Sequence, residues 1–334
     1  MRRYGIYIML LLCLASSCER DHLYYGANNK AIIGLRIDWS QAQLKPNGAT
    51  VVAYGEDGAL FEAFPYMSNP NYATIALPEG SYDVLIYNNT PGEYRSVAFR
   101  GMERMERYEA YAMVKEPLRR SIGRSGAEDV IVADPDTLAT ARVMGLKITS
   151  DMIQYYYNRP DGSALGAVVA EVAVVPERAI SVATIRAHVK GLCYAASAPV
   201  AHLRNMSGGF YLGLGQNSAC VVTHEFILNN RTFNPGSTTD GMICNQITTF
   251  GLLTPESVRA PHRYYLDVDF MLVDGQKYPV SIDITDRLKV ARGVHTQLTV
   301  EVEIELPKAI GGGGGGAFDT GVGEWNDTTV EIPM

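Results

Sequence analysis

The sequence predicts an all-β protein built from two tandem β-sandwich domains. Short strand-like runs recur roughly every ten residues along most of the chain, and turn residues separate them. Several of the later runs alternate apolar with polar residues, the pattern of a strand with one buried face. A length of 334 residues is enough for two such domains.

The composition is that of a folded, acidic protein. Hydrophobic residues make up 47% of the chain and charged residues 19%, which argues against disorder. The formal net charge is -7, and Lys and Arg form no stripe along the chain. Because neutralised phosphates supply most of the affinity for nucleic acid, we exclude that class of partner.

The N-terminus has the layout of a secretory signal. Arg2 and Arg3 precede an apolar run at residues 6–14, and small residues follow. The run is much shorter than the roughly 20 residues that a membrane-spanning helix needs. The signal peptide is therefore expected to cover residues 1–17, and a polar tether residues 18–30.

The stretch Leu14-Ala15-Ser16-Ser17-Cys18 resembles a bacterial lipobox, with Ala15 where that motif more often has Leu or Val. The resemblance implies that Cys18 becomes the first mature residue and carries the lipid. It also implies an outer-membrane lipoprotein at the cell surface or the periplasmic face. The alternative is an ordinary signal peptide with an incidental cysteine.

Residues 31–115 are expected to form the first sandwich. Glu56-Asp57-Gly58 lies between two apolar runs, and Asp-Gly in that position is a strong hairpin signal. In Leu77-Pro78-Glu79-Gly80-Ser81-Tyr82-Asp83-Val84, Pro presets a turn, Gly takes a positive φ, and Tyr82 enters the core. Met102, Met105 and Tyr108 recur at helical spacing, which predicts a short amphipathic helix within residues 101–115.

The Leu77–Val84 motif resembles the turn-and-strand signature of transthyretin-like sandwiches. Together with the lipobox and Ile37-Asp38-Trp39, it is similar to the first domain of the fimbrillin-like, type V pilus-related lipoproteins of Bacteroidales. The uncharacterised families of that group are the nearer match. The resemblance implies a pilus anchor or accessory subunit that pairs with other subunits by donated strands.

Residues 116–135 form a basic linker. Its Pro, Gly and Ser content is typical of an exposed connector. Pilins of the resembled group are matured by cleavage after an arginine, so Arg119, Arg120 and Arg124 are alternative processing sites. A solvated loop between the domains is the preferred interpretation.

Residues 136–308 are expected to form the second sandwich. Residues 180–189, 264–272 and 298–306 alternate in polarity, so their buried faces are strongly specified. Val273-Asp274-Gly275 predicts a hairpin. Residues 151–158 are ambiguous, and residues 164–175 fit either a buried helix or a strand.

Residues 309–334 form a Gly-rich leash with a strand at its end. Gly311 to Gly316 are consecutive, and such a run loses much entropy if ordered. Beyond it, Thr328, Val330 and Ile332 share one face, next to Trp325. We expect this segment to dock on a sheet edge of its own body or of a partner by strand addition. A disordered tail is the alternative.

No enzyme motif is present, and we expect neither catalysis, cofactor nor metal. Cys193, Cys220 and Cys244 permit at most one internal disulfide, and three buried, inert thiols are the preferred reading. Asp267, Asp269 and Asp283 fit a solvated acidic face better than a Ca²⁺ site. The alternative function is a surface lipoprotein that binds a host ligand, a glycan or a peptide, without forming a pilus.

Overall fold

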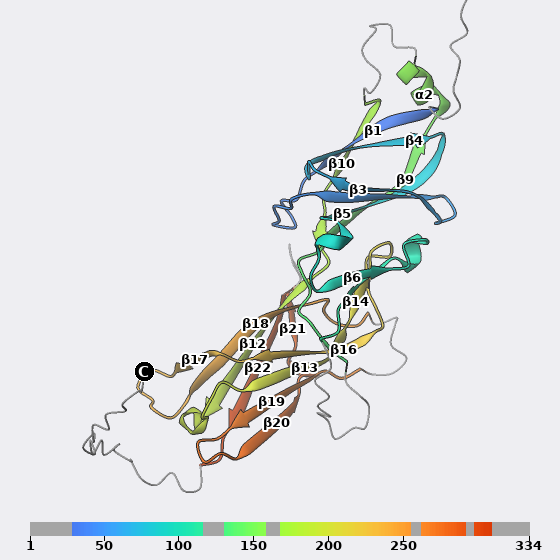
Figure 1. Ribbon diagram of the computed structural model, residues 1–334. Helices are drawn as coiled ribbons and strands as arrows, with labels where there is room; N and C mark the ends of the chain where they lie inside the picture. The colour runs from blue at the N-terminus through green and yellow to red at the C-terminus, as the bar shows by residue number, and fades with distance from the viewer. Residues whose placement is uncertain (1–28, 116–129, 158–167, 255–261, 292–296, 309–334) are drawn as a thin grey trace, which may run out of the picture.

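The computed structural model describes residues 29–115, 130–157, 168–254, 262–291 and 297–308. These residues form an elongated molecule in which two β-sandwiches lie one above the other, with a smaller sheet between them (Figure 1). The only α-helix in the described residues is α2 (Ser150–Tyr157). The predicted all-β class is therefore confirmed.

The first sandwich consists of two sheets, here called sheet 1 and sheet 2. Sheet 1 has the order β10-β1-β4, and sheet 2 has the order β11-β9-β5-β2-β3. Their strands are β1 (Lys30–Ile37), β2 (Ala49–Gly55), β3 (Leu60–Met67), β4 (Tyr72–Pro78), β5 (Gly80–Asn88), β9 (Ala139–Ile148), β10 (Ala170–Val174) and β11 (Glu177–Arg178). Alternate apolar residues of the two sheets, among them Ile33, Val51, Ile75 and Ile86, bury one core between them.

The second sandwich packs two five-stranded sheets, sheet 4 with the order β17-β18-β12-β22-β21 and sheet 5 with the order β20-β19-β13-β16-β8. Their strands are β8 (Ile131–Val132), β12 (Ser181–Lys190), β13 (Val200–Ser207), β16 (Val221–Ile227), β17 (Asn230–Phe233), β18 (Gly241–Thr249), β19 (Tyr265–Met271), β20 (Lys277–Asp283), β21 (Lys289–Ala291) and β22 (Gln297–Glu305). The 3-10 turns η3 (Leu192–Tyr194) and η5 (Thr285–Arg287) connect them.

Sheet 3 joins the two sandwiches. Its order is β15-β14-β7-β6, from β6 (Val97–Arg100), β7 (Glu109–Ala112), β14 (Gly209–Tyr211) and β15 (Gln216–Asn217). The 3-10 turns η1 (Pro91–Glu93) and η2 (Met105–Arg107) flank its first two strands. Since β6 and β7 come from the first half of the chain and β14 and β15 from the second, this sheet ties the halves together by backbone hydrogen bonds.

A cluster of tyrosines fixes sheet 3 against the outer face of sheet 2. Tyr54 and Tyr87 project from sheet 2 and are fully buried. The hydroxyls of Tyr87 and Tyr108 are 2.8 Å apart, and the Tyr87 ring stacks on Phe99. Because the same core continues into the second sandwich, the junction is packed rather than hinged.

The strand pairing corrects the expected domain boundary at residue 136. β9 pairs along most of its length with β5, and β10 pairs in parallel with β1, so residues 139–178 contribute to the first sandwich. Within the expected linker, β8 pairs with β16 of the second sandwich. The boundary prediction was wrong because these pairings join segments distant in sequence.

Two local predictions also change. Residues 101–115 form η2 and β7 instead of an amphipathic helix, and Met105 and Tyr108 reach the core from this irregular segment. The ambiguous residues 164–175 contain strand β10.

The facing of the regular strands is confirmed. In β19, Leu266, Val268 and Phe270 are buried, and in β22 Val300, Val302 and Ile304 are buried while the three glutamates are exposed. Gly58 and Gly275, at φ 75° and 82°, make the two expected hairpin turns.

Candidate functional site: an open sheet edge

The residues predicted to carry the lipid, to be processed or to donate a strand lie outside the described part of the chain. Cys18, the three linker arginines and the tail residues Trp325, Thr328, Val330 and Ile332 all do so. The lipid anchor and the donor strand therefore stay predictions. None of the helices in the described ranges is long and apolar enough to cross a membrane.

An open edge of sheet 1 is the most distinctive feature of the described residues. β4 pairs with β1 over seven residues, and no described strand pairs with its other side. Ala73, Ile75 and Leu77 point into the core, whereas Thr74 and Ala76 are on the solvent side. β4 contains no charged residue.

The other sheet edges among the described residues are protected. β3 carries Glu62 and Pro65, and β20 carries Lys277, Pro279 and Asp283. Charge and proline at these places obstruct pairing with a further strand. The remaining edge strands, β6, β8, β10, β11, β15, β17 and β21, have five residues or fewer. β4 is thus the one described edge that is both long and without charge.

The register shows which backbone groups of β4 are available. The Ile37 N–H donates to the Asn71 carbonyl at 2.9 Å, at the start of the antiparallel β1–β4 ladder. Hydrogen-bonded pairs alternate along such a ladder, so Ala73, Ile75 and Leu77 direct their N–H and C=O groups toward β1. Thr74 and Ala76 direct theirs away from it. This edge therefore offers two donors and two acceptors to another strand.

Sheet 1 has three strands and faces the five strands of sheet 2, of which β11 has only two residues. Residues outside sheet 1, namely Trp39, Ala42 and Ile153, fill part of the core beside it. Half-buried apolar residues lie at the margin of this core, among them Leu44, Phe64 and Met67. A strand added beside β4 would widen sheet 1 and bury more apolar surface.

Three polar residues, Arg36, Tyr72 and Glu171, interact on the solvent face of sheet 1 and are here called the clasp. The Tyr72 hydroxyl donates to Glu171 Oε1 at 3.2 Å across β1, and Glu171 also forms an ion pair with Arg36. Tyr72 passes directly over Gly34, where a Cβ would lie 2.5 Å from the tyrosine oxygen. Desolvation and the Glu171 carboxylate raise the pKa of Tyr72, so the hydroxyl keeps its proton as a donor. The clasp leaves the outer backbone of β4 free.

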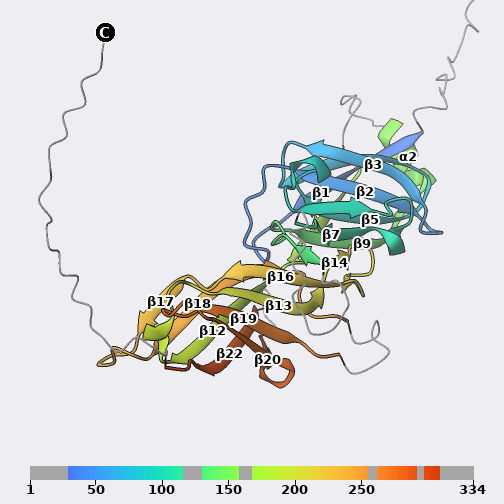
Figure 2. The same ribbon diagram turned by 60° about the horizontal axis from the view of Figure 1, so that its bottom comes forward.

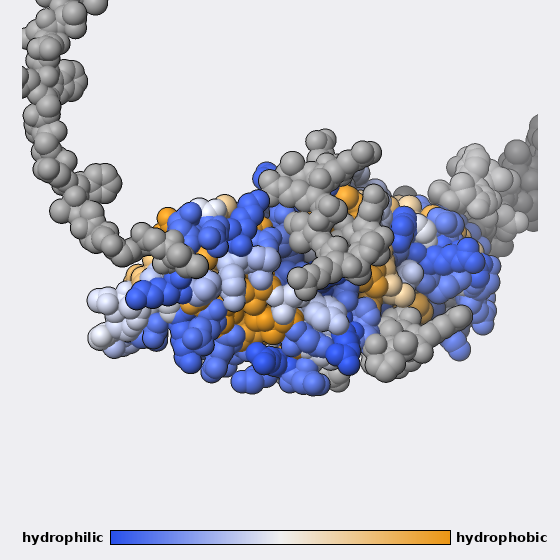
Figure 3. Space-filling model, turned by 90° about the horizontal axis from the view of Figure 1, so that it is seen from below, coloured by the Kyte–Doolittle hydropathy of each residue, from blue (hydrophilic) through white to orange (hydrophobic). Residues whose placement is uncertain are grey.

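Exposed apolar side chains do not define a docking surface by themselves. The face seen in Figure 3 is largely hydrophilic, with apolar surface confined to patches. The exposed large apolar residues are scattered over many elements, from Phe61 and Tyr66 in β3 to Val290 in β21. Backbone pairing is therefore better supported than apolar docking as a mode of contact.

Cys193, Cys220 and Cys244 are free thiols, but they are not buried as expected. Cys220 is exposed, and Cys193 and Cys244 are half-buried. The prediction that all three thiols are buried is therefore wrong.

The acidic residues do not converge on a cation. Asp267 accepts hydrogen bonds from Arg204 at 3.1 Å and Ser281 at 2.5 Å, and Asp283 pairs with Arg263 at 2.7 Å. No group of three or more potential metal ligands occurs in the described ranges.

Two histidines, His202 and His224, are buried in sheet 5. His202 is buried on sheet 5 with its Nε2 3.2 Å from Glu225, and His224 is fully buried with its Nδ1 3.5 Å from Asp134.

Comparison with known proteins places the chain in a family. A family model described as "Domain of unknown function (DUF5119)" matches residues 17–226, which is more than half of the chain. The chain belongs to the DUF5119 family. A search of curated proteins finds no match.

Among solved structures, this DUF5119 protein is similar to a proposed adhesin from Bacteroides ovatus, with 20% identity and a TM-score of 0.59. The match covers 88% of this chain and 98% of that one. The fimbrial anchor protein Mfa2 from Porphyromonas gingivalis matches at 12% identity and a TM-score of 0.43, over 77% and 83% of the two chains. The similarity to the Bacteroides ovatus protein shows that this chain shares its fold.

Sequence reasoning missed the β4 edge. The run Tyr72–Leu77 has no charge, and Pro78-Glu79-Gly80 sends the chain from sheet 1 to sheet 2 instead of into a hairpin partner. The lack of charge was visible in the sequence, but the absence of a neighbour depends on the topology.

Proposed function

We propose that this protein is a non-catalytic, lipid-anchored cell-surface protein of the fimbrial type, a pilus anchor or accessory subunit. In this proposal it is tethered to the outer membrane through Cys18 and contacts its neighbours by β-strand addition. The open, uncharged edge of β4 carries the proposal, because strand addition requires unpaired backbone groups on an accessible edge. The fold, shared with a proposed adhesin, supports it.

The proposed donor is the tail segment Trp325–Ile332 of a neighbouring subunit. Its residues Thr328, Val330 and Ile332 alternate with Thr329 and Glu331, and in β4 the buried Ala73, Ile75 and Leu77 alternate with the solvent-side Thr74 and Ala76. Paired side by side, the two triplets would share the core-facing side of sheet 1. Each donated strand would then extend both the hydrogen-bond ladder and the apolar face.

The position of the last described strand favours an exchange between molecules. β22 runs parallel to β12 and ends beside Lys190, and the Leu306 N–H donates to the Lys190 carbonyl. This end of the second sandwich is remote from β4 in the first (Figures 1 and 2). A donor at one end and an acceptor at the other make a head-to-tail contact, which propagates into a chain of subunits.

A binding measurement tests the strand addition. The body ending at Lys308 is titrated with a fluorescent peptide of residues 324–334, and a peptide of the same composition without the alternation serves as the control. We expect saturable binding of the native peptide alone. Equal binding of both peptides, or of neither, would contradict the proposal.

The lipid anchor has a separate test. The N-terminal peptide of the mature protein, isolated from membranes, is expected to begin at Cys18 and to carry acyl mass. The Cys18→Ala variant should appear in the soluble fraction. An unmodified thiol at Cys18 in membrane-derived protein would exclude the anchor without bearing on the β4 edge.

A surface lipoprotein that binds a glycan or a peptide without forming a pilus is the second candidate. The observation that favours it is a polar pocket in the first sandwich, formed by four segments of the chain. A protein that binds ligand in this pocket and shows no tail-dependent association would fit this candidate.

A further inference from the structure

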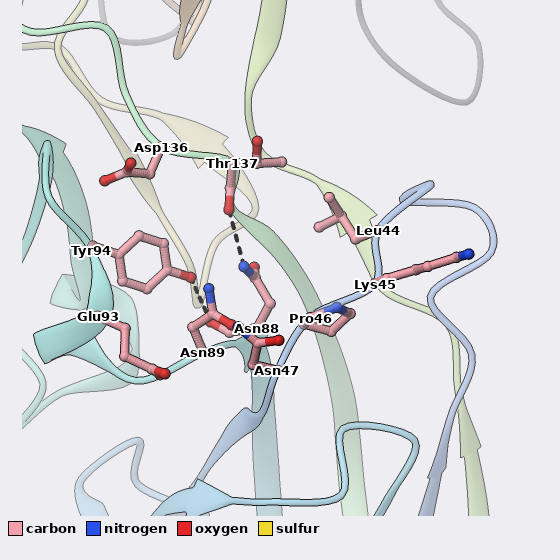
Figure 4. A pocket seen from close by; sticks show the side chains of 10 residues that line it. All are labelled: Leu44, Lys45, Pro46, Asn47, Asn88, Asn89, Glu93, Tyr94, Asp136 and Thr137. Atoms are coloured by element: carbon pink, nitrogen blue, oxygen red, sulfur yellow. Dashed lines mark hydrogen bonds between the residues drawn. The ribbon is translucent and has the colours of Figure 1, made fainter.

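The pocket lies where the loop before β2, the end of β5, the η1 turn and the segment before β9 meet. It has a volume of about 240 Å³. Figure 4 shows Glu93, Tyr94 and Asp136 on one side and Leu44, Lys45 and Pro46 on the other, with Asn88 and Asn89 between them.

The floor of the pocket is held rigidly. Asn88 is almost completely buried, its Nδ2 donates to the Thr137 carbonyl at 3.0 Å, and its Oδ1 accepts from the Ala139 N–H at 2.7 Å. The Tyr94 hydroxyl donates to the Asn88 carbonyl. Such a network preorganises the neighbouring side chains for a ligand.

Asn89 is positioned by its backbone and leaves its side chain available. Its N–H donates to the Gly48 carbonyl at 2.9 Å, and its carbonyl accepts from the Thr50 hydroxyl at 2.7 Å. The backbone is left-handed, with φ 58°. The side-chain Oδ1 is buried and has no hydrogen-bond partner among the described residues, so an incoming donor would satisfy it.

Each of the two carboxylates of the pocket accepts hydrogen bonds through only one of its two oxygens. Glu93 Oε2 accepts from the Thr90 N–H at 2.6 Å, and Asp136 Oδ2 accepts from the Arg95 and Ser96 N–H groups. These bonds fix both side chains. The other oxygen of each makes no hydrogen bond within the described part of the chain and is available as an acceptor.

We infer that this pocket binds one neutral sugar unit of a glycan. Sugar hydroxyls both donate and accept, and the pocket supplies free acceptors on Asn89, Glu93 and Asp136 together with donors on Asn47, Asn89 and Thr137. Leu44 and Pro46 add a small apolar wall for the C–H face of a ring. The carboxylates disfavour an anion, and the polar lining and small volume disfavour a bulky apolar ligand.

The inference does not rest on strand addition, because the pocket and β4 are separate features of the first sandwich. A protein lacking residues 309–334 should bind sugar as well as the full chain does. Failure of the tail peptide to bind β4 would thus not affect this inference. Failure of the pocket to bind sugar would likewise not affect the proposed strand addition.

Saturation-transfer NMR of the full-length mature protein tests it, with the methyl glycosides of glucose, galactose, mannose and N-acetylglucosamine as probes. We expect at least one glycoside to bind. Asn89→Gly should weaken that binding at least tenfold while the melting temperature stays the same or rises, because glycine accepts the positive φ and the lost side chain makes no internal bond.

Asn205→Gly is the matched control, since Asn205 also has a positive φ, 69°, but lies on sheet 5. It removes a hydrogen bond to the Arg263 carbonyl and should leave sugar binding unchanged. The inference is overturned if none of the four glycosides gives a transfer signal. It is also overturned if Asn89→Gly binds as tightly as the unaltered protein.

Discussion

Proline at position 74 should block the β4 edge without unfolding the protein. Thr74 is exposed, and its N–H points away from β1, so the substitution removes a donor that the described fold does not use. Proline is tolerated at edge positions of this kind. We therefore expect the free energy of unfolding of Thr74→Pro to stay within about 1 kcal/mol of the original value.

The loss of binding can be estimated from the backbone. A strand beside β4 would use the N–H and C=O groups of Thr74 and Ala76, and one net hydrogen bond contributes about 0.5–1.5 kcal/mol. The proline ring also occupies the space in which the facing carbonyl would lie. Together these effects should cost at least about 1.4 kcal/mol, which is a tenfold weaker Kd.

The assay is the titration of the body ending at Lys308 with the peptide of residues 324–334. Thr74→Val is the matched control, because it keeps the N–H and the branched side chain and should bind as the unaltered body does. Unchanged affinity of Thr74→Pro, with its stability preserved, would refute the assignment of β4 as the acceptor. A large loss in Thr74→Val would show that the side chain, and not the backbone, makes the contact.

Three further predictions concern stability. Gly34→Val should lower the free energy of unfolding by about 1–3 kcal/mol in chemical denaturation, because its Cβ displaces Tyr72 from the clasp. Tyr54→Phe should be neutral or stabilising, because the buried Tyr54 hydroxyl has no hydrogen-bond partner among the described residues, whereas Tyr108→Phe should cost about 1–2 kcal/mol by removing its hydrogen bond to the buried Tyr87 hydroxyl; equal effects in thermal unfolding would contradict this. Burial raises the pKa of Tyr87 and Tyr108, so the folded state keeps protons that the unfolded chain releases above about pH 10. Stability should therefore fall by about 1.4 kcal/mol per pH unit for each such tyrosine above that pH, and a flat profile between pH 9 and 11 in denaturant titrations would speak against their burial.

The facing of individual strands could be predicted because alternation is a local property. In β22 a one-residue shift would bury three glutamates, and this fixed which face meets the core. The hairpin glycines Gly58 and Gly275 were predictable for the same reason, since a tight turn requires a positive φ at one particular residue.

The partners of the strands could not be predicted. Residues 139–148 carry the same strand signals whether they pair with β5 or with a strand of the second sandwich, and only the assembled sheet decides. Met102, Met105 and Tyr108 recur at helical spacing, yet they reach the core from irregular backbone around η2. The spacing of these residues alone did not distinguish an amphipathic helix from irregular backbone with buried side chains.

The two candidate sites differ from the predicted ones because both depend on tertiary structure. β4 is a site since sheet 1 ends there, and the pocket exists since four distant segments meet around Asn88 and Asn89. The sequence shows two consecutive asparagines at positions 88 and 89, but it does not reveal the unsatisfied amide oxygen of Asn89.

Amide hydrogen exchange of the body ending at Lys308, measured with and without the peptide of residues 324–334, tests strand addition at β4 most directly. Thr74 and Ala76 carry the outward N–H groups of β4, so these two amides should become protected when the peptide binds. Ala73 and Ile75, already bonded to β1, should change much less. Binding that leaves Thr74 and Ala76 unprotected, or that protects another sheet edge instead, would contradict the account.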